Sequence, residues 1–271
     1  MAIAQPPDRV RSGPRPPQPT TRQAQAKIRQ AAKVRFQKAR IAEREYQRAL
    51  TAVGRQVGNI IDGFTKRNPL GNQQQMQATL QSYSELIGPW AKSVTQRMHA
   101  EVGWRDLRAW KQLSDQIGKG LTAELASAPV GAAFSAMLAE QVVLIKSLPL
   151  EAGQRVHELT VQGLTGGARF DEVIPEILRS GQVTIGRAKL IARTETARTS
   201  SVLTQVRAEH VGSDAYIWRS AEDEAVRPEH RKLNGHTFKW SDPPIAGTNG
   251  MRYHPGQGPN CRCYPEPVLM P

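Results

Sequence analysis

Two cysteines and two histidines near the C-terminus carry the side chains best suited to bind a metal. Cys261 and Cys263 are separated by one residue, and His254 and His230 precede Cys261 by seven and thirty-one residues. Thiolates and imidazoles are preferred ligands of zinc, which takes four ligands in a tetrahedron at structural sites. A zinc ion held by these residues would cross-link the Gly- and Pro-rich loop at 242–259 to the segment before it. Zinc is therefore one candidate cofactor.

The same loop has a second candidate anchor that needs no metal. Asp223, Arg227 and His230 can tie the preceding segment to the loop through charge-assisted hydrogen bonds, with the two cysteines buried as small apolar groups. A single residue between two cysteines is a rarer spacing in zinc sites than two residues, which favours this hydrogen-bonded anchor. The residues alone leave both alternatives open.

Glu195 is an unexpected carboxylate on an apolar helical face. It lies seven residues after Ala188 and seven before Val202, within a helix predicted from about 184 to 210. Burying a lone carboxylate costs on the order of several kcal/mol, and Arg198 is the nearest cation on the same side. We expect a structural ion pair that anchors this helix to the terminal domain, although a catalytic or metal-bound carboxylate is an alternative. The polar network predicted around it comprises Arg193, Glu195, Asp223 and Arg227.

Hydrophobic spacing predicts that most of the preceding chain is helical. Apolar residues recur every three or four positions from Thr21 to Phe64, the pattern of one long amphipathic helix. Pro89 should kink or restart the next helical segment. Further helices are predicted at about 76–94, 104–125, 134–145, 151–163 and 170–180. Glycines are expected to weaken or interrupt the helices at Gly54, Gly58, Gly63 and Gly181.

Beyond these helices the sequence predicts a small sheet. Apolar and polar residues alternate at 215–219 and 236–240, and Asn234-Gly235 is a strong turn signal before the second segment. The predicted fold class is mainly α with a small α+β C-terminal domain, in which a short sheet is closed by the Cys-x-Cys loop. Its expected parts are a disordered basic Pro-rich arm at 1–20, a helical region at 21–149 and the terminal domain at 150–271.

The positive charge of the chain is concentrated near its N-terminus. Residues 1–58 hold thirteen Lys and Arg against three acidic residues, which accounts for +10 of the net charge of +13. Such an imbalance indicates sequence-independent contact with double-stranded DNA through its phosphates. The residues predicted to bind DNA are Arg22, Lys27, Arg29, Lys33, Arg35, Lys38, Arg40, Arg44 and Arg48.

No uninterrupted run of eighteen apolar residues occurs, so we expect no membrane partner. Two cysteines one residue apart cannot form a disulfide that cross-links distant parts of the fold, which indicates a reducing compartment.

Several motifs in the last third of the chain resemble one known family. They are Arg193-Thr-Glu195, Asp223-Glu-Ala-Val-Arg227-Pro-Glu-His230, Leu233-Asn-Gly235, His254-Pro255 and Cys261-Arg-Cys263. In this order, over about residues 150–268, they are similar to the phage Mu F-like family of minor head (head morphogenesis) proteins. Some relatives carry Cys-x-x-Cys where this chain has residues 227–230, which would complete a four-cysteine zinc site that is absent here.

The resemblance implies a minor capsid protein of a tailed phage, made in the host cytoplasm. It would sit inside the head near the portal, contact the portal, major capsid or scaffolding protein, and aid genome packaging or ejection.

Two other functions are compatible with the residues. An ADP-ribosyltransferase-like enzyme or a metal-dependent nuclease could use Glu195, Asp223, Arg227 and His230, but the sequence has no Gly-rich phosphate loop and no nucleophile elbow. We therefore expect no enzymatic activity. A DNA-reading helix-turn-helix at 151–180 would instead make the protein a regulator.

Overall fold

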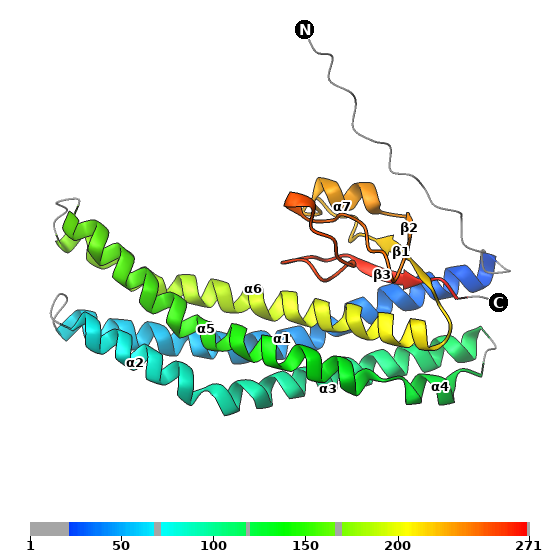
Figure 1. Cartoon of the computed structure of the whole chain (residues 1–271), viewed down its shortest axis with the longest axis horizontal. Coiled ribbons are helices and arrows are strands. Elements are labelled where there is room, and N and C mark those ends of the chain that lie inside the picture. The colour runs from blue at the N-terminus through cyan, green and yellow to red at the C-terminus, as the bar shows by residue number, and fades with distance from the viewer. Residues whose placement is uncertain (1–21, 68–71, 118–119, 166–169, 270–271) are drawn as a thin grey trace, which may run out of the picture.

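The protein is an elongated helical body with a small α+β domain seated on one end of it (Figure 1). The computed structural model describes residues 22–67, 72–117, 120–165 and 170–269. The body is built from the following helices: α1 (Arg22–Arg67), α2 (Gln73–Leu86), α3 (Gly88–Gln116), α4 (Thr122–Ser127), α5 (Val130–Thr165) and α6 (Phe170–His210). This confirms a mainly α protein with a small sheet at its C-terminal end.

The longest helices, α1 and α6, pack against each other more extensively than any other pair of elements. Glycines make this close contact possible. A Cβ atom on Gly181 would lie 2.8 Å from the Cα of Gly58, and a Cβ on Gly54 would lie 2.9 Å from the side chain of Ile185. The predicted interruption at Gly181 was wrong, because α6 runs through this residue without a break. The role of these glycines is to let two backbones approach.

Two prolines have different places in the helices. Pro89 is at the first turn of α3, where its missing N–H costs nothing, so the predicted restart is confirmed. Pro149 lies inside α5, which continues to Thr165, and the boundary predicted between residues 149 and 150 falls within this helix. Its neighbours Leu148 and Ala152 are buried in the body. Tertiary packing therefore holds α5 together where local propensity would break it.

The candidate helix-turn-helix at 151–180 is made of the adjoining ends of two long helices. Its first part is the end of α5 and its second part is the beginning of α6, and these two long helices pack along each other. Residues 166–169, between them, lie outside the described residues.

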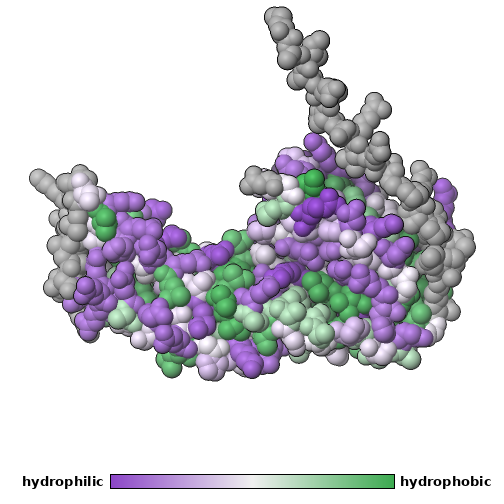
Figure 2. Space-filling view, in the orientation of Figure 1, coloured by the Kyte–Doolittle hydropathy of each residue, from purple (hydrophilic) through white to green (hydrophobic). Residues whose placement is uncertain are grey.

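One stretch of the described residues, Thr122–Gly163, is long and apolar enough to cross a membrane by length and composition alone. It includes α5, whose inner face packs in the body through Ile145 and Leu148, while Val143 and Leu150 remain exposed. Core helices of soluble proteins pass the same test. Figure 2 shows apolar patches along the body. In the same view, the surface of the molecule is hollowed beside the C-terminal domain.

The C-terminal domain contains a three-stranded antiparallel sheet in the order β2-β1-β3. Its strands are β1 (Ala215–Arg219), β2 (Thr237–Lys239) and β3 (Tyr264–Pro267). β1 and β2 match the predicted strands, and Gly235 adopts the positive φ of 82° that the turn signal requires. A short helix, α7 (Pro228–Leu233), and a 3₁₀ turn, Thr248–Gly250, complete the domain. β3 and α7 were not predicted.

This domain shares a hydrophobic core with the helical body. Trp218 and Trp240 from the sheet region pack in one buried cluster with Trp110 of α3 and Ile28 of α1, and the two cysteines belong to the same cluster. Because the first turns of α1 help to cover the sheet, the N-terminal helix and the C-terminal domain form one packed unit.

Candidate nucleic-acid groove and metal-ligating cluster

The cations predicted to bind DNA lie along the first half of α1, and most of them are exposed. Lys38 is half-buried and Lys27 donates to the carbonyl of Gln116 at 2.8 Å. The exposed members are Arg22, Lys27, Arg29, Lys33, Arg40, Arg44 and Arg48. Residues 1–20, the predicted basic arm, lie outside the described residues.

Arg35 is the exception, because it is only 4% exposed. Its guanidinium lies 4.5 Å from the centre of the Trp110 ring and its Nε is 3.9 Å from the Asp106 carboxylate, which also pairs with buried Arg207. Asp106 is thus a buried carboxylate between two guanidinium groups. The prediction that Arg35 contacts DNA is wrong, since its charge is used inside the protein.

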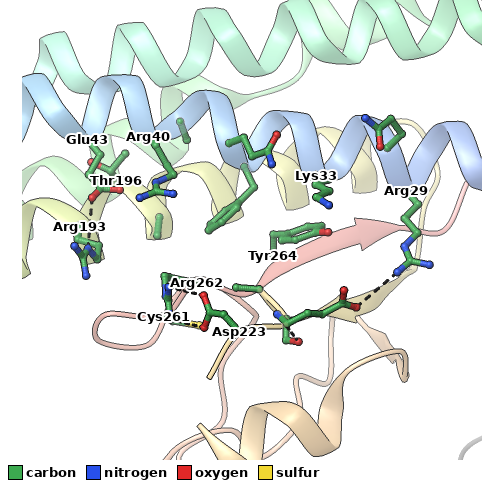
Figure 3. Close-up of a pocket in the computed structure, with 18 of the residues that line it drawn as sticks. Arg29, Lys33, Arg40, Glu43, Arg193, Thr196, Asp223, Cys261, Arg262 and Tyr264 are labelled. Atoms are coloured by element: carbon green, nitrogen blue, oxygen red, sulfur yellow. Dashed lines mark hydrogen bonds and ion pairs between the residues drawn. The ribbon is translucent and has the colours of Figure 1, made fainter. Parts of the chain in front are cut away.

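A cavity of about 490 Å³ opens between α1, α6 and the loops of the C-terminal domain. We call it the basic groove, and its charged residues are Arg29, Lys33, Arg40, Glu43, Arg193, Glu222, Asp223 and Arg262. Figure 3 shows Arg40 and Arg193 reaching into it from two different helices, with Lys33 extending toward Tyr264. Five cations against three carboxylates leave the groove with net positive charge.

The three carboxylates of the groove are each engaged by an arginine. Glu43 lies 3.4 Å from Arg193, Glu222 lies 3.7 Å from Arg29, and Asp223 lies 2.6 Å from Arg262. Among the described residues, Lys33 and Arg40 form no ion pair. These two cations are therefore available to an anion that enters the groove.

An aromatic contact closes one wall of the groove. The rings of Phe36 on α1 and Tyr264 on β3 are stacked at 5.3 Å. Burial raises the pKa of Tyr264, so its hydroxyl stays neutral at physiological pH. The contact fastens α1 to the sheet and fixes the spacing between the two sides of the groove.

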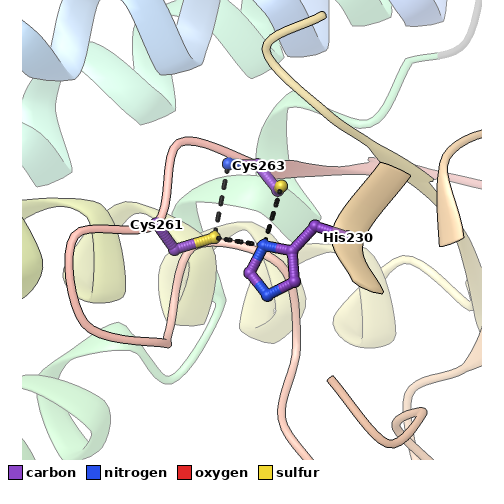
Figure 4. A group of neighbouring side chains, drawn as sticks. All are labelled: His230, Cys261 and Cys263. Carbon is purple, nitrogen blue, oxygen red and sulfur yellow. Dashed lines mark hydrogen bonds between the residues drawn. The ribbon is translucent and has the colours of Figure 1, made fainter. Parts of the chain in front are cut away.

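Behind the groove, three metal-ligating side chains converge in a buried position. His230, Cys261 and Cys263, which we call the thiol cluster, have their ligand atoms within 4.8 Å of one another, and each residue is at most 2% exposed (Figure 4). The Nδ1 atom of His230 is 3.6 Å from Sγ of Cys261 and 3.5 Å from Sγ of Cys263. Both cysteines are free thiols. Three of the four predicted metal ligands are therefore brought together.

The fourth predicted ligand, His254, is not part of this group. Its Nδ1 is 3.1 Å from the hydroxyl of Tyr216, and its ring packs against Trp240. Burial lowers the pKa of His254 to about 4, so the ring is neutral at physiological pH. The assignment of His254 to a common site with the cysteines is corrected: it supports the sheet core.

The two thiols of the cluster ionise differently. A hydrogen bond from the neighbouring Cys263 thiol lowers the pKa of Cys261, while the same pairing and burial raise the pKa of Cys263. The backbone N–H of Cys263 also donates to Sγ of Cys261 at 3.4 Å. Cys261 is therefore the thiol of the pair that deprotonates first.

Two comparisons show what this chain is similar to. Residues 154–265 match the family model described as Phage Mu protein F like protein. This region is similar to the phage Mu F-like family. An uncharacterized protein of Haemophilus influenzae is 34% identical over 172 residues, which are 63% of this chain and 36% of that protein. The chain thus spans about a third of that relative's length. No solved structure matches this chain.

The Mu F-like region contains the whole thiol cluster. It also contributes Arg193, Asp223 and Arg262 to the basic groove. The other wall of the groove comes from α1, which precedes the matched residues. The groove therefore joins the family region to a basic helix outside it.

The polar residues predicted as one network form separate contacts in the Mu F-like region. Arg193 pairs with Glu43 and donates to Asn260, whereas Asp223 pairs with Arg262. The Arg227 guanidinium donates to the carbonyl of Pro259 at 2.7 Å. Together with the contact of His230 to the carbonyl of Ala246, these bonds tie the loop to the rest of the domain.

Glu195 has a different role from the one expected. Its carboxylate lies 3.5 Å from Arg198, as predicted, and accepts a hydrogen bond of 2.9 Å from Gln141 on α5. Gln141 in turn lies 2.6 Å from His99 on α3. Glu195 therefore joins three helices of the body and does not anchor α6 to the terminal domain. The four residues considered for catalysis are Glu195, Asp223, Arg227 and His230. Each of them contacts different partners.

Two contributing residues were missed by sequence reasoning. Asn260 adopts a positive φ of 53° and its side chain and backbone contact Arg193 and Thr194 on α6. Tyr253 donates to the carbonyl of Ala246 beside His230. The Pro-Asn-Cys turn could have indicated Asn260, because asparagine tolerates this conformation. No sequence signal distinguishes Tyr253 from an ordinary loop aromatic.

Proposed function

We propose that the protein is a minor head protein of a tailed phage, in which the Mu F-like region docks at the portal or the inner shell and the basic face of α1 contacts packaged DNA. The observation that carries the proposal is the family match over residues 154–265. Portal, major capsid and scaffolding proteins are the expected protein partners. The protein would be assembled in the host cytoplasm and reside inside the head.

The DNA contact is supported by the arrangement of exposed cations. Four exposed cations lie along α1: Lys33, Arg40, Arg44 and Arg48. At a helical rise of about 1.5 Å per residue, they extend over about 22 Å of the helix. The first two also line the basic groove without an acidic partner. A helix face of this kind neutralises phosphates without reading bases. Sequence-blind, salt-sensitive binding is the expected behaviour.

Two experiments test the two halves of the proposal. Cross-linking of purified virions followed by mass spectrometry should join the Mu F-like region to the portal or inner shell, and cross-links confined to tail proteins would contradict the docking. Filter binding of the full chain to unrelated duplexes should give equal affinities that fall steeply with salt. Strong preference for one duplex would contradict the proposed DNA contact.

A further inference from the structure

The thiol cluster brings two sulfur atoms to a single nitrogen atom. Sγ atoms of Cys261 and Cys263 both approach the same atom, Nδ1 of His230, at 3.6 and 3.5 Å. A neutral imidazole has one lone pair, on one nitrogen, and it accepts one hydrogen bond well. Nδ1 can therefore accept from only one of the two thiols at a time, although both sulfurs lie at contact distance from it.

The environment of the imidazole fixes which nitrogen carries this lone pair. Nε2 of His230 is 3.1 Å from the carbonyl oxygen of Ala246, and this oxygen can only accept. Tyr253 donates to the same carbonyl, so its hydroxyl oxygen can accept from Nε2 at 3.2 Å. The proton therefore sits on Nε2, and the lone pair of Nδ1 faces the two sulfurs. Metal-ligating histidines are oriented by this kind of second hydrogen bond.

We infer that His230, Cys261 and Cys263 form a three-residue zinc site. Zinc–sulfur bonds of about 2.3 Å and zinc–nitrogen bonds of about 2.0–2.1 Å, at a tetrahedral angle, place sulfur and nitrogen about 3.5–3.6 Å apart. The two observed separations are 3.5 and 3.6 Å. Both sulfur–nitrogen separations fit a tetrahedral ion, and two sulfurs with one nitrogen select zinc over calcium or magnesium, which prefer oxygen.

The fourth position is open to a water molecule or a small ligand. Tyr253 cannot fill it, because its hydroxyl contacts Nε2, on the side of the ring away from the sulfurs. Cys261 also lines the basic groove, which provides a route to the site for the metal. The site therefore has three protein ligands and an access route.

The zinc would fasten the C-terminal loop in the conformation that shapes the groove. His230 comes from α7, and the two cysteines flank Arg262, which pairs with Asp223 in the groove. Asn260, directly before Cys261, contacts α6 through Arg193. Holding the two cysteines thus fixes both residues that connect the loop to the groove. This inference is independent of the phage role proposed above.

The test is the metal content of the full chain, purified without chelator and supplied with zinc. We expect about one zinc per chain in the wild type and less than a tenth as much in Cys261→Ser and His230→Gln. The matched control is His254→Gln, which removes a nearby buried histidine outside the cluster and should keep the zinc. Equal zinc in His230→Gln and His254→Gln, or none in the wild type, would overturn the site.

A second measurement on the unmodified protein covers variants that fail to fold. Replacement of zinc by cobalt should produce the visible bands of a tetrahedral cobalt ion together with thiolate charge-transfer absorption in the near ultraviolet. Chelator should lower the thermal midpoint of the wild type and change the fluorescence of Trp218, which lies edge-on to His230 at 5.3 Å. Absence of the thiolate band, or a midpoint that chelator leaves unchanged, would contradict the proposal.

Discussion

At the residue scale, the sequence identified the side chains near the C-terminus that matter, but not how they are grouped. His230 and His254 are equally plausible ligands by spacing, and both are buried. Only the folded chain shows that one ring faces the cysteines and the other faces Tyr216. The direction of a side chain that leaves a loop depends on the whole path of that loop, which spacing does not encode.

The burial of Arg35 could have been predicted from the sequence. It lies three positions after Ala32 and four before Ala39, on the apolar stripe of α1, and both alanines are buried. A cation on such a stripe faces the core, by the same reasoning that singled out Glu195. Counting it with the exposed cations overlooked this periodicity.

The buried carboxylate beside Arg35 should be essential for stability. Replacing Asp106 by Asn would leave two guanidinium groups without their counter-ion in a site where all three residues are at most 4% exposed. We expect the free energy of unfolding to fall by about 3–5 kcal/mol. Urea denaturation measures the change.

The matched control for Asp106 is Asp115→Asn on the same helix, where the side chain is exposed. This change should stay within about 0.5 kcal/mol of the wild type. Similar losses in the two variants would show that Asp106 is not the centre of a buried ion cluster.

His254 should make stability depend on pH in the acid range. Its pKa is about 4 in the folded protein, below the ordinary value near 6.5, because burial disfavours the charged ring. The unfolded chain therefore binds a proton first as pH falls. The contribution of His254 is complete above about pH 6.5 and is lost as pH falls toward 4, by at most about 3 kcal/mol.

Urea midpoints measured from pH 7.5 to 4 test this prediction. His254→Gln should flatten the decline, whereas His157→Gln, at an exposed histidine on α5, should leave it unchanged. An equally steep decline in His254→Gln would assign the acid sensitivity to other groups.

At the element scale, hydrophobic periodicity predicted the long helices well and the small elements poorly. The spacing of apolar residues over α1 was sufficient because one face of the helix is buried along most of its length. β3 was missed because its four residues, including two prolines, are all buried, so that no alternation marks it. α7 has only six residues, too few for a helical period to be visible.

Glycines were misinterpreted for a related reason. Propensity describes a helix in isolation, whereas Gly58 and Gly181 are explained by the helix opposite each of them. Gly181→Ala places a Cβ 2.8 Å from the backbone of Gly58, which should force α1 and α6 apart. We expect a net destabilisation of about 1–3 kcal/mol, measured by urea denaturation.

Gly186, five residues further along α6, provides the control. A Cβ added there meets no atom within 4 Å, so Gly186→Ala should stabilise the helix by about 0.5–1 kcal/mol. If both alanines are stabilising, the close contact of α1 with α6 does not depend on glycine.

At the scale of the whole molecule, the ends of the chain meet. The sequence suggested a basic N-terminal region and a separate C-terminal domain, but α1 covers the sheet and forms one wall of the basic groove. Long-range packing of this kind has no local signal, since the stacked rings of Phe36 and Tyr264 are 228 positions apart. The charge asymmetry of the sequence therefore becomes a surface built from both ends.

That surface gives the final prediction. Lys33→Gln combined with Arg40→Gln removes the two groove cations that have no acidic partner among the described residues. Each phosphate contact contributes about 0.9 to the slope of log K against log salt for duplex DNA, so the double variant should lower this slope by about 1.8. Lys92→Gln combined with Arg97→Gln removes the same charge from exposed positions on α3, outside the groove, and should leave the slope near that of the wild type. Filter binding between 50 and 200 mM salt, the range over which such contacts change affinity most visibly, measures the difference. Equal slopes for the two double variants would mean that DNA responds only to the total charge of the protein, and the basic groove would then have no special part in binding it.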